Sequence, residues 1–316
     1  MELVNSTSDS ALLSLLGALS ARHYRWTTPT PETQRRVLAR PERQVAGDLA
    51  GVFGWSLPFA PDSIEPEIVS LMRAGGILRQ HGNLLASTLR VSRLGDLLFL
   101  HSAYPTNESD AVFFGPDTYR FARYIEAELA KADTMPRRLV DIGCGSGAGA
   151  LLAAKASGAP DIVLVDINPA ALHLARINAA AAGIAVRTAA SDILKDTDGT
   201  FDLVVANPPY LVDDDKRVYR HGGDLRGAGL SLRIAQEAAE RLNPGGRLLL
   251  YSASAIADGI DAFKAAVVPA LHARGCSVTY EEIDPDVWGE ELDRPAYRAV
   301  DRIAVVGVHA LKGAVP

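Results

Sequence analysis

The chain has 316 residues, more than one compact domain needs and enough for two. With 48% hydrophobic and 22% charged residues, it has the composition of an ordinary globular protein with a sizeable core. Its net charge of −6 excludes a global basic field that would gather nucleic acid, while a local basic groove stays open.

The cysteine content and the apolar stretches indicate the compartment in which the protein works. Cys144 and Cys276 are too few for a disulfide framework or a cysteine-rich zinc site, so we expect a reducing cytoplasm and no metal. The apolar stretch 11–21 follows acidic rather than basic residues, which favours a first amphipathic helix over a signal peptide. No run approaches roughly 20 apolar residues, so we expect no transmembrane helix.

Residues 1–112 have the pattern of a small α+β accessory domain. Helical periodicity covers residues 10–23, 31–39, 43–53 and 62–72, and strand-like pieces follow at 77–80, 85–92 and 97–101. Helices followed by a β-hairpin suggest a winged-helix-like module. A DNA-reading wing would be basic. This region instead carries ten Arg against eleven Asp and Glu, which favours packing or substrate recognition.

Residues 113–316 form the expected catalytic domain, in which strands and helices alternate. We expect strands at 138–142, 162–166, 185–189, 201–206 and 247–252, helices at 147–156, 169–182, 230–242 and 260–273, and terminal strands at 277–282 and 303–309. The strands are nearly continuous apolar runs, as a parallel sheet covered on both faces requires. The sequence therefore predicts a doubly wound, Rossmann-like α/β fold.

A glycine-rich turn links the first strand of this domain to its first helix. It contains Gly143, Cys144, Gly145 and Gly147, and glycines at this place let the backbone approach a ligand closely. Asp166 ends the second strand, where a carboxylate accepts both ribose hydroxyls of a nucleotide. These features alone are equally compatible with an NAD dehydrogenase. Cys144 is interpreted as a small filler of the loop.

Two further acids favour S-adenosyl-L-methionine over a dinucleotide. Asp141 precedes the first glycine, where it would repel a pyrophosphate but suits the cationic amine of a methionine. Asp192 follows the third strand and is placed to accept from the adenine amine, while Ile167 and Ile193 would enclose the ring. A helix cap is the alternative role of Asp192.

The candidate catalytic motif is Asn207-Pro208-Pro209-Tyr210, directly after the fourth strand. An amide or aryl amine nitrogen is a poor nucleophile because its lone pair is delocalised. The Asn207 side-chain carbonyl and the Pro208 backbone carbonyl can accept both of its hydrogens and aim the lone pair at the methyl group. Pro209 helps to fix the backbone, and Tyr210 offers a flat face to a planar target. A simple turn is the alternative.

These motifs in this order resemble the class I amino-methyltransferases with an NPPY motif over residues 112–310. The chain is most similar to HemK-like protein glutamine methyltransferases and to small-domain ribosomal RNA guanine methyltransferases. The resemblance implies seven strands with an antiparallel last pair. It also implies that Asp141, Gly143, Gly145 and Gly147 hold the methionine part, that Asp166 and Asp192 hold the nucleoside, and that Asn207, Pro208 and Tyr210 bind the target nitrogen.

Two other segments resemble this family. Residues 113–119 resemble a Pro-x-x-Asp-Thr-Phe segment of the archaeal and eukaryotic HemK-like branch, which implies cofactor contacts for Phe114 and Thr118. The bacterial branch has a Pro-Arg-Pro-Glu-Thr stretch and an all-helical N-terminal module instead, so the chain departs from it. Residues 219–223, with Gly227, resemble a glycine-containing loop over the substrate, in which His221 is either a substrate contact or a solvated histidine.

The sequence thus predicts a cytoplasmic N-methyltransferase with a macromolecular acceptor, a protein glutamine before an RNA or DNA base, and no membrane partner. Two other classes stay open. An NAD(P) oxidoreductase shares the glycine loop but has no use for Asn-Pro-Pro-Tyr. A catalytically silent regulator that binds S-adenosylmethionine would keep the pocket and not the motif.

Overall fold

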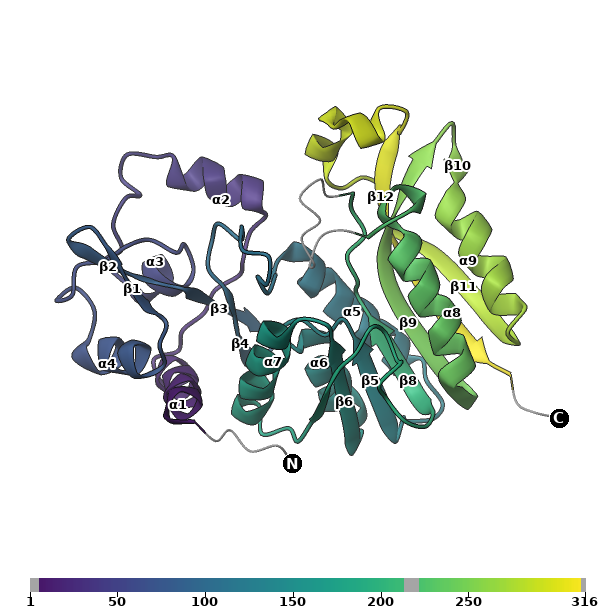
Figure 1. Ribbon diagram of the computed structural model, residues 1–316, viewed down its shortest axis with the longest axis horizontal. Helices are drawn as coiled ribbons and strands as arrows, with labels where there is room; N and C mark the ends of the chain where they lie inside the picture. Colours follow the sequence, from purple (N-terminus) through teal and green to yellow (C-terminus); the bar gives the residue numbers. More distant parts are fainter. Residues whose placement is uncertain (1–5, 213–221, 314–316) are drawn as a thin grey trace.

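The computed structural model describes residues 6–212 and 222–313. The chain begins with a small α+β region, drawn in purple and blue in Figure 1, which lies beside a large twisted sheet covered by helices. A boundary near residue 112, between β4 (Leu97–Ser102) and α5 (Pro116–Ala130), remains our proposal for the division into two domains.

Between residues 6 and 112, the N-terminal region contains four helices and two β-hairpins. Its helices are α1 (Thr7–Ala21), α2 (Pro31–Leu38), α3 (Leu49–Phe53) and α4 (Pro66–Ala74). Side chains of Ser6, Thr30 and Asp48 cap the first three, each accepting from a backbone N–H two or three positions into its helix. The hairpins pair β1 (Leu78–His81) with β2 (Leu84–Ser87), and β3 (Leu89–Leu94) with β4.

Two predictions for this region were wrong in detail. The helix expected over 43–53 is confined to Leu49–Phe53, because Asp48 accepts from the Gly51 N–H at 2.6 Å and starts the helix there. The strand expected over 85–92 is divided at Thr88, whose N–H donates to the carbonyl of Ile77 instead of a strand partner. Each half then pairs in its own hairpin.

The central sheet has the order β11-β12-β9-β8-β5-β6-β7, with short β10 on β9. Its strands are β5 (Arg138–Ile142), β6 (Asp161–Asp166), β7 (Arg187–Ala190), β8 (Phe201–Ala206), β9 (Leu242–Ala257), β10 (Ile260–Asp261), β11 (Cys276–Asp284) and β12 (Arg302–Lys312). Strands β5 to β9 are parallel, and β12 runs antiparallel between β9 and β11. The doubly wound fold and its antiparallel end are confirmed.

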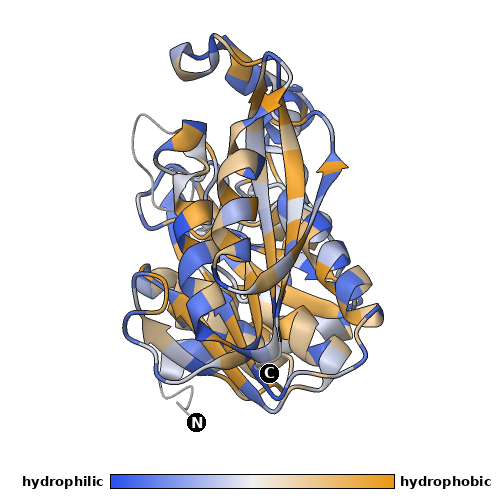
Figure 2. Cartoon of the chain, turned by 90° about the vertical axis from the view of Figure 1, so that its right-hand side faces the viewer, coloured by the Kyte–Doolittle hydropathy of each residue, from blue (hydrophilic) through white to orange (hydrophobic). Residues whose placement is uncertain are grey.

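Helices cover both faces of this sheet. α8 (Gly229–Arg241) and α9 (Ala262–His272) share one core with it, while α5 and α6 (Ala148–Ser157) share another on the opposite face. The strands are hydrophobic over much of their length in Figure 2. The sequence did not predict α5, and the predicted helix at 260–273 starts at Ala262 because β10 takes the first two residues. The predicted strand at 247–252 extends over all of β9, and residues 243–246 form an irregularity in its pairing with β8.

The N-terminal region is joined to the sheet domain by α7 (Pro169–Ala181). Ala171, Leu174 and Ile177 of this helix belong to the hydrophobic core of the N-terminal region. The fully buried Asn178 exchanges hydrogen bonds with the backbone of Leu100 in β4, at 2.8 and 3.1 Å. Its amide also donates to the Ser146 carbonyl at 2.9 Å. One side chain therefore ties the accessory region to the glycine-rich turn.

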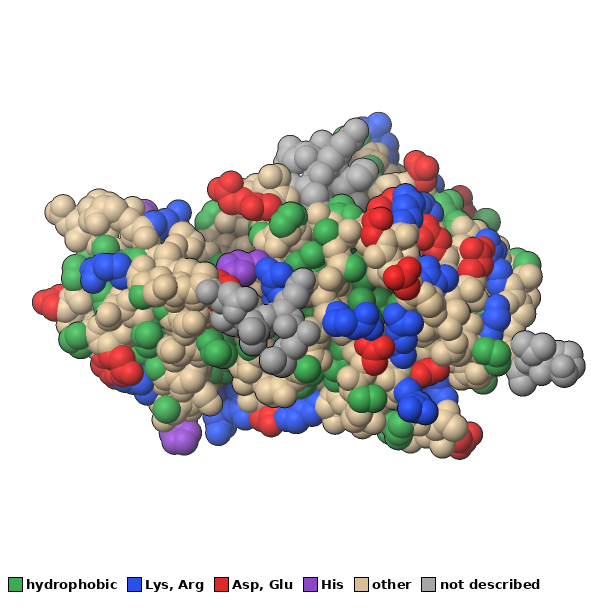
Figure 3. All heavy atoms as spheres, turned by 60° about the horizontal axis from the view of Figure 1, so that its bottom comes forward, with side chains coloured by type: hydrophobic (Ala, Val, Ile, Leu, Met, Phe, Trp, Pro, Cys, Tyr) green, Lys and Arg blue, Asp and Glu red, His purple; other side chains and the backbone are tan. Residues whose placement is uncertain are grey.

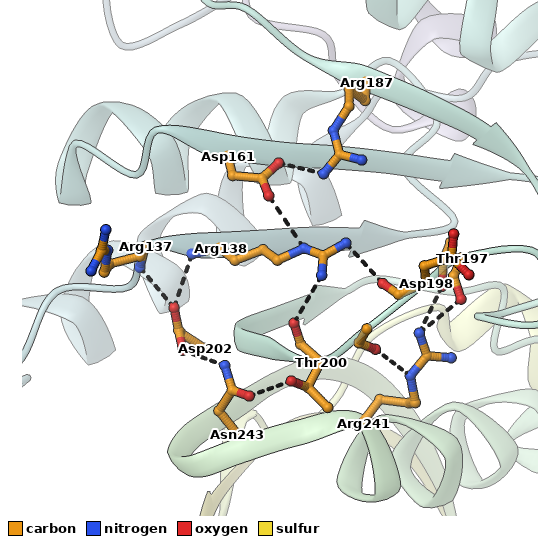
Figure 4. A network of polar contacts seen from close by, with 11 residues as sticks. Arg137, Arg138, Asp161, Arg187, Thr197, Asp198, Thr200, Asp202, Arg241 and Asn243 are labelled. Atoms are coloured by element: carbon orange, nitrogen blue, oxygen red, sulfur yellow. Dashed lines mark hydrogen bonds and ion pairs between the residues drawn. The ribbon is translucent and has the colours of Figure 1, made fainter.

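The amino edge of the sheet is closed by a polar network, drawn in Figure 4. Asp202 accepts from the backbone N–H groups of Arg137 and Arg138, both at 2.9 Å, and from the Asn243 amide at 2.6 Å. Asp161 forms ion pairs with Arg138 at 3.3 Å and Arg187 at 2.6 Å. Both aspartates at this edge are thus bound by groups of the protein itself.

Surface charge, membrane-spanning helices and metal-binding clusters each bear on what the protein could bind. On the face shown in Figure 3, acidic and basic side chains are intermingled. In the part of the chain that the structure describes, no helix has the length and apolarity needed to cross a bilayer. Within the same residues, no cluster of His, Cys, Asp and Glu could hold a metal ion.

Candidate active site

The carboxyl edge of the same sheet holds a cavity of about 190 Å³. Segments after β5, β6, β7 and β8 line it, as expected where parallel strands end together. Of the residues singled out in the sequence, the cavity is lined by Thr118, Asp141, Gly143, Cys144, Gly145, Asp166, Ile167, Asp192, Ile193, Asn207, Pro208 and Pro209. Four separate motifs therefore meet in one place.

The glycine-rich turn has the backbone conformation that its sequence indicated. Gly143, Gly145 and Gly147 have φ of +69°, +52° and +82°, a region that other residues rarely adopt. The N–H groups of Gly143 and Cys144 donate to the Val165 carbonyl at 2.8 and 2.9 Å. The turn is consequently held against the end of β6.

Asp166 is the carboxylate that fixes this turn. Its Oδ2 accepts from the Gly145 N–H and its Oδ1 from the Asn168 N–H, both at 2.9 Å. Burial raises the pKa of this carboxyl above its usual value. Since a carboxylate has about four acceptor positions, these bonds leave acceptor capacity for a hydroxyl group of a ligand in the cavity. Asp166 thus fits a ribose while it holds the turn.

Asp141 lies beneath the turn and is 2% exposed. Its Oδ2 accepts from the Ala150 N–H at 2.8 Å. Burial, together with the negative charge of Asp166, raises its pKa to about 7. A cationic ligand group in the cavity would reverse this effect, because an opposite charge stabilises the ionised carboxylate.

Asp192 is placed differently, at the open side of the cavity. Lys195 and Arg233 both form ion pairs with it, the latter at 3.1 Å, and the hydrogen bond from Lys195 is the main cause of its lowered pKa. Ile167 and Ile193 line the same end. Ile167 is 56% exposed, unusual for a large apolar side chain, and would be covered by a flat ring bound there.

A second cavity of about 240 Å³ adjoins the first and shares four lining residues with it, Phe113, Asn207, Pro208 and Pro209. Its other walls come from distant parts of the chain: Pro31 and residues 104–107 of the N-terminal region, Asp117, Tyr210, Leu211 and Trp288. The motif after β8 thus stands between two cavities, one on the nucleotide side and one reaching the accessory region.

Tyr210 is part of a buried polar cluster in the second cavity. Its ring lies 6.4 Å from that of Tyr251 between centroids, and it is 8% exposed. Asp117 interacts with the Tyr210 hydroxyl and accepts from the Tyr251 hydroxyl at 3.0 Å. Burial raises the pKa of Asp117 and that of Tyr210. These bonds fix the orientation of the Tyr210 ring.

Two predicted residues, Phe114 and Gly147, line neither cavity. Phe114 is fully buried against Phe99 and stacks on His101 with centroids 5.0 Å apart. Neighbouring residues of an extended segment point opposite ways, so Phe113 reaches the cavities instead. Gly147 starts α6 and lies against α7, where a Cβ would meet the Ala175 Cβ at 3.3 Å.

Sequence reasoning did not single out Phe113, Asp117 and Trp288 as site residues, although all three line the second cavity. Asp117 lay inside the quoted 113–119 segment, but nothing local marked Trp288. Of the predicted loop, Tyr219 to His221 lie outside the described residues, while Gly222 donates to the Leu211 carbonyl at 2.8 Å. Gly222 is crowded so closely by the Gly227 and Pro209 carbonyls that no side chain fits.

Comparison with known proteins gives one family match: Methyltransferase small domain, over residues 123–257. The release factor glutamine methyltransferase of Deinococcus radiodurans is 34% identical over 155 residues, which cover 46% of this chain and 55% of that protein. The ribosomal RNA small subunit methyltransferase C of Shewanella loihica is 35% identical over 123 residues, covering 38% and 32%. The chain spans about half the length of the release factor relatives that it matches.

Among solved structures, a Thermus thermophilus 16S rRNA N2 G1207 methyltransferase in complex with AdoMet and guanosine matches with a TM-score of 0.46 and 18% identity. The match covers 81% of this chain and 64% of that one.

Proposed function

We propose that this protein transfers a methyl group from S-adenosylmethionine to a planar nitrogen of a macromolecule, namely the side-chain amide of a protein glutamine. Residues 123–257, which match the methyltransferase small domain, support the methyl transfer. The observation that carries this proposal is the position of Asn207, Pro208 and Pro209, which line both the nucleotide-side cavity and the second cavity. A methyl group passed between two cavities must cross at such a shared wall.

We assign the first cavity to the methyl donor. Asp166 would take the ribose hydroxyls, Asp141 the amine of the methionine part, and Asp192 the adenine amine, with Ile167 and Ile193 against the ring and the glycine-rich turn and Thr118 around them. Phe113 takes the place that the resemblance implied for Phe114. When bound, S-adenosylmethionine supplies an electrophilic methyl group.

We assign the second cavity to the acceptor nitrogen. The Asn207 side chain and the Pro208 carbonyl accept its two hydrogens, which localises the lone pair as the new bond forms. The rigid Pro208-Pro209 backbone keeps these acceptors in place. Tyr210, fixed by Asp117, forms part of the wall for the planar group. No basic side chain is required at the nitrogen, because its proton can leave after the transfer.

A protein acceptor is supported by the relatives named release factor glutamine methyltransferase and by the balanced charge of residues 1–112. The second candidate, an exocyclic amine of an RNA base, is favoured by the relatives named ribosomal RNA small subunit methyltransferase C. The same two hydrogen-bond acceptors would serve either nitrogen, since both are flat and carry two hydrogens.

The experiment that tests the proposal has two parts. S-adenosylhomocysteine should raise the melting temperature of the protein by mass action, and NADH should not. Lysate from a strain that lacks the gene is then incubated with the protein and methyl-labelled cofactor, and label is sought in protein and in RNA. A melting shift with NADH alone would point to an oxidoreductase, and label in RNA alone would select the second candidate.

A further inference from the structure

Trp288 lines the acceptor cavity and comes from a segment to which the proposed function assigns no role. It lies between β11 and β12, at the start of the short helix η2 (Gly289–Asp293), which is followed by η3 (Pro295–Tyr297). This segment, residues 285–300, is remote in sequence from the catalytic motif. Trp288 nevertheless lines the same cavity as Asn207 and Tyr210.

The backbone of Trp288 is strained. Its φ is +57° and its ψ is +39°, the left-handed region that a bulky side chain disfavours. Such a conformation is unfavourable by itself and persists where the surrounding structure enforces it. Here the Val287 N–H donates to the Ile303 carbonyl and the Glu291 N–H to the Trp288 carbonyl, both at 2.8 Å. Strain of this kind is concentrated at binding sites.

The same segment is clamped to the chain just after the catalytic motif. The Val212 N–H donates to the Tyr297 hydroxyl at 2.8 Å, and Arg294 donates to the Val212 carbonyl at 2.9 Å. Arg294 is itself held by the buried Glu291 at 2.8 Å. Both backbone groups of Val212 are therefore bound by the segment that carries Trp288, and the indole is fixed relative to Asn207.

The burial of the indole nitrogen indicates which part of the Trp288 side chain could meet a ligand. Its Nε1 is buried and has no acceptor in hydrogen-bond geometry among the described residues, although it approaches the Tyr210 hydroxyl. The polar edge of the ring is thus turned away from solvent. Since Nε1 is the one polar atom of the side chain and is buried, the indole can contribute only hydrocarbon atoms to the cavity wall.

We propose that Trp288 is an acceptor-binding residue, whose indole ring packs flat against the planar side-chain amide that receives the methyl group. This assignment rests on the proposed function and deepens it. Asn207 and Pro208 hold the hydrogens of the nitrogen, and Trp288 sets the plane of the amide, so that the lone pair faces the donor cavity.

Trp26 provides a matched control. Its Nε1 is also buried without an acceptor among the described residues, and its ring contacts Trp55 at 4.8 Å between centroids. Trp26 belongs to the core of the N-terminal region and lines neither cavity. The chain has 3 tryptophans, so three indole N–H resonances are expected in an NMR spectrum, and Trp288→Phe and Trp26→Phe assign two of them.

The test uses the full chain with S-adenosylhomocysteine and two probes. N-acetylglutamine N-methylamide has one primary amide, on its side chain, and N-acetylnorleucine N-methylamide has the same backbone without it. The glutamine probe should shift the Trp288 resonance saturably and leave Trp26 in place, while the norleucine probe shifts neither. Trp288→Leu should weaken binding of the glutamine probe about tenfold, and Trp288→Phe, which keeps an aromatic face, by less than about threefold.

Several results would overturn the assignment: no saturable shift of Trp288, equal shifts with both probes, or unchanged binding in Trp288→Leu. A shift with guanosine and none with the glutamine probe would also overturn it. Stabilisation by S-adenosylhomocysteine and loss of transfer in an Asn207 variant do not depend on Trp288. The proposed function can therefore stand while this assignment fails, and the two failures are distinguishable.

Discussion

The aspartates at the two edges of the central sheet differ in their partners and in their access to a cavity. At the amino edge, Asp161 and Asp202 are bound by arginine side chains, backbone N–H groups and Asn243. At the carboxyl edge, Asp141 and Asp166 accept backbone N–H groups, line a cavity and have raised pKa values because they are buried. The first arrangement favours stability, and the second keeps acceptor capacity for a ligand.

Asparagine occurs at both edges, and its replacement should give the largest difference between them, in the rate of methyl transfer. Asn207→Ala should slow methyl transfer about a hundred- to a thousand-fold and leave cofactor affinity nearly intact, because it removes an acceptor that strengthens as the nitrogen becomes cationic. The measurement is a single-turnover rate with cofactor binding by titration. Asn243→Ala, which removes the amide bonded to Asp202, should leave the rate unchanged. A near wild-type rate for Asn207→Ala would show that the Asn-Pro-Pro-Tyr motif is a simple turn without a catalytic role.

The aspartates should differ in the same way. Asp166→Ala leaves ribose hydroxyls and the Gly145 N–H without an acceptor, so it should weaken S-adenosylhomocysteine binding by about 1.5–3 kcal/mol, roughly ten- to 150-fold. Asp202→Ala should not change this affinity. Calorimetric titration of both folded variants decides the matter, and an unaltered affinity in Asp166→Ala would leave that residue only a structural role.

Asp141 should make cofactor binding depend on pH. Its pKa of about 7 means that the free protein holds a proton there below neutrality, whereas the ligand's amine favours the ionised form. Affinity should therefore fall roughly five- to tenfold between pH 8 and pH 6. The folded-state pKa is above that of the unfolded chain, so the ligand-free protein loses stability as pH rises from about 4 to about 7. In Asp141→Asn, titrations at these pH values should show neither trend.

At the amino edge the expected effect is on stability alone. Asp202→Ala removes the acceptor of two backbone N–H groups and of Asn243, and should lower the free energy of unfolding by about 1–3 kcal/mol. Urea unfolding measures this difference. If stability stayed unchanged while cofactor binding fell, the assignment of stability to the amino edge and of ligand binding to the carboxyl edge would be wrong.

The smallest expected effect concerns nucleic acid. Residues 1–112 are close to neutral, and charges of both signs are intermingled on the face shown in Figure 3. The full chain should therefore bind duplex DNA only weakly at ~0.15 M salt. Submicromolar affinity with a steep salt dependence in a gel-shift assay would contradict this and promote the RNA candidate.

The carboxyl edge could be predicted from the sequence because its residues directly follow apolar strands. Asp141, Asp166, Asp192 and Asn207 are each recognisable from a local pattern, and parallel strands bring their ends together. Trp288 follows no such pattern, since tertiary contacts alone bring its segment to the motif. The division of the predicted strand 85–92 at Thr88 could not be predicted for the same reason. Thr88 suits a strand, but a distant carbonyl takes its N–H.

The hydrogen bonds of Asn178 have a consequence for evolution and for engineering. This side chain binds Leu100 of the accessory region and Ser146 of the glycine-rich turn, within a helix whose outer face belongs to the accessory core. An accessory region exchanged for that of another enzyme would leave apolar residues of α7 exposed, and the buried Asn178 side chain would lose both of its hydrogen bonds to Leu100. We therefore expect the two regions to unfold as one cooperative unit, and a chimera would have to carry α7 along with its N-terminal partner.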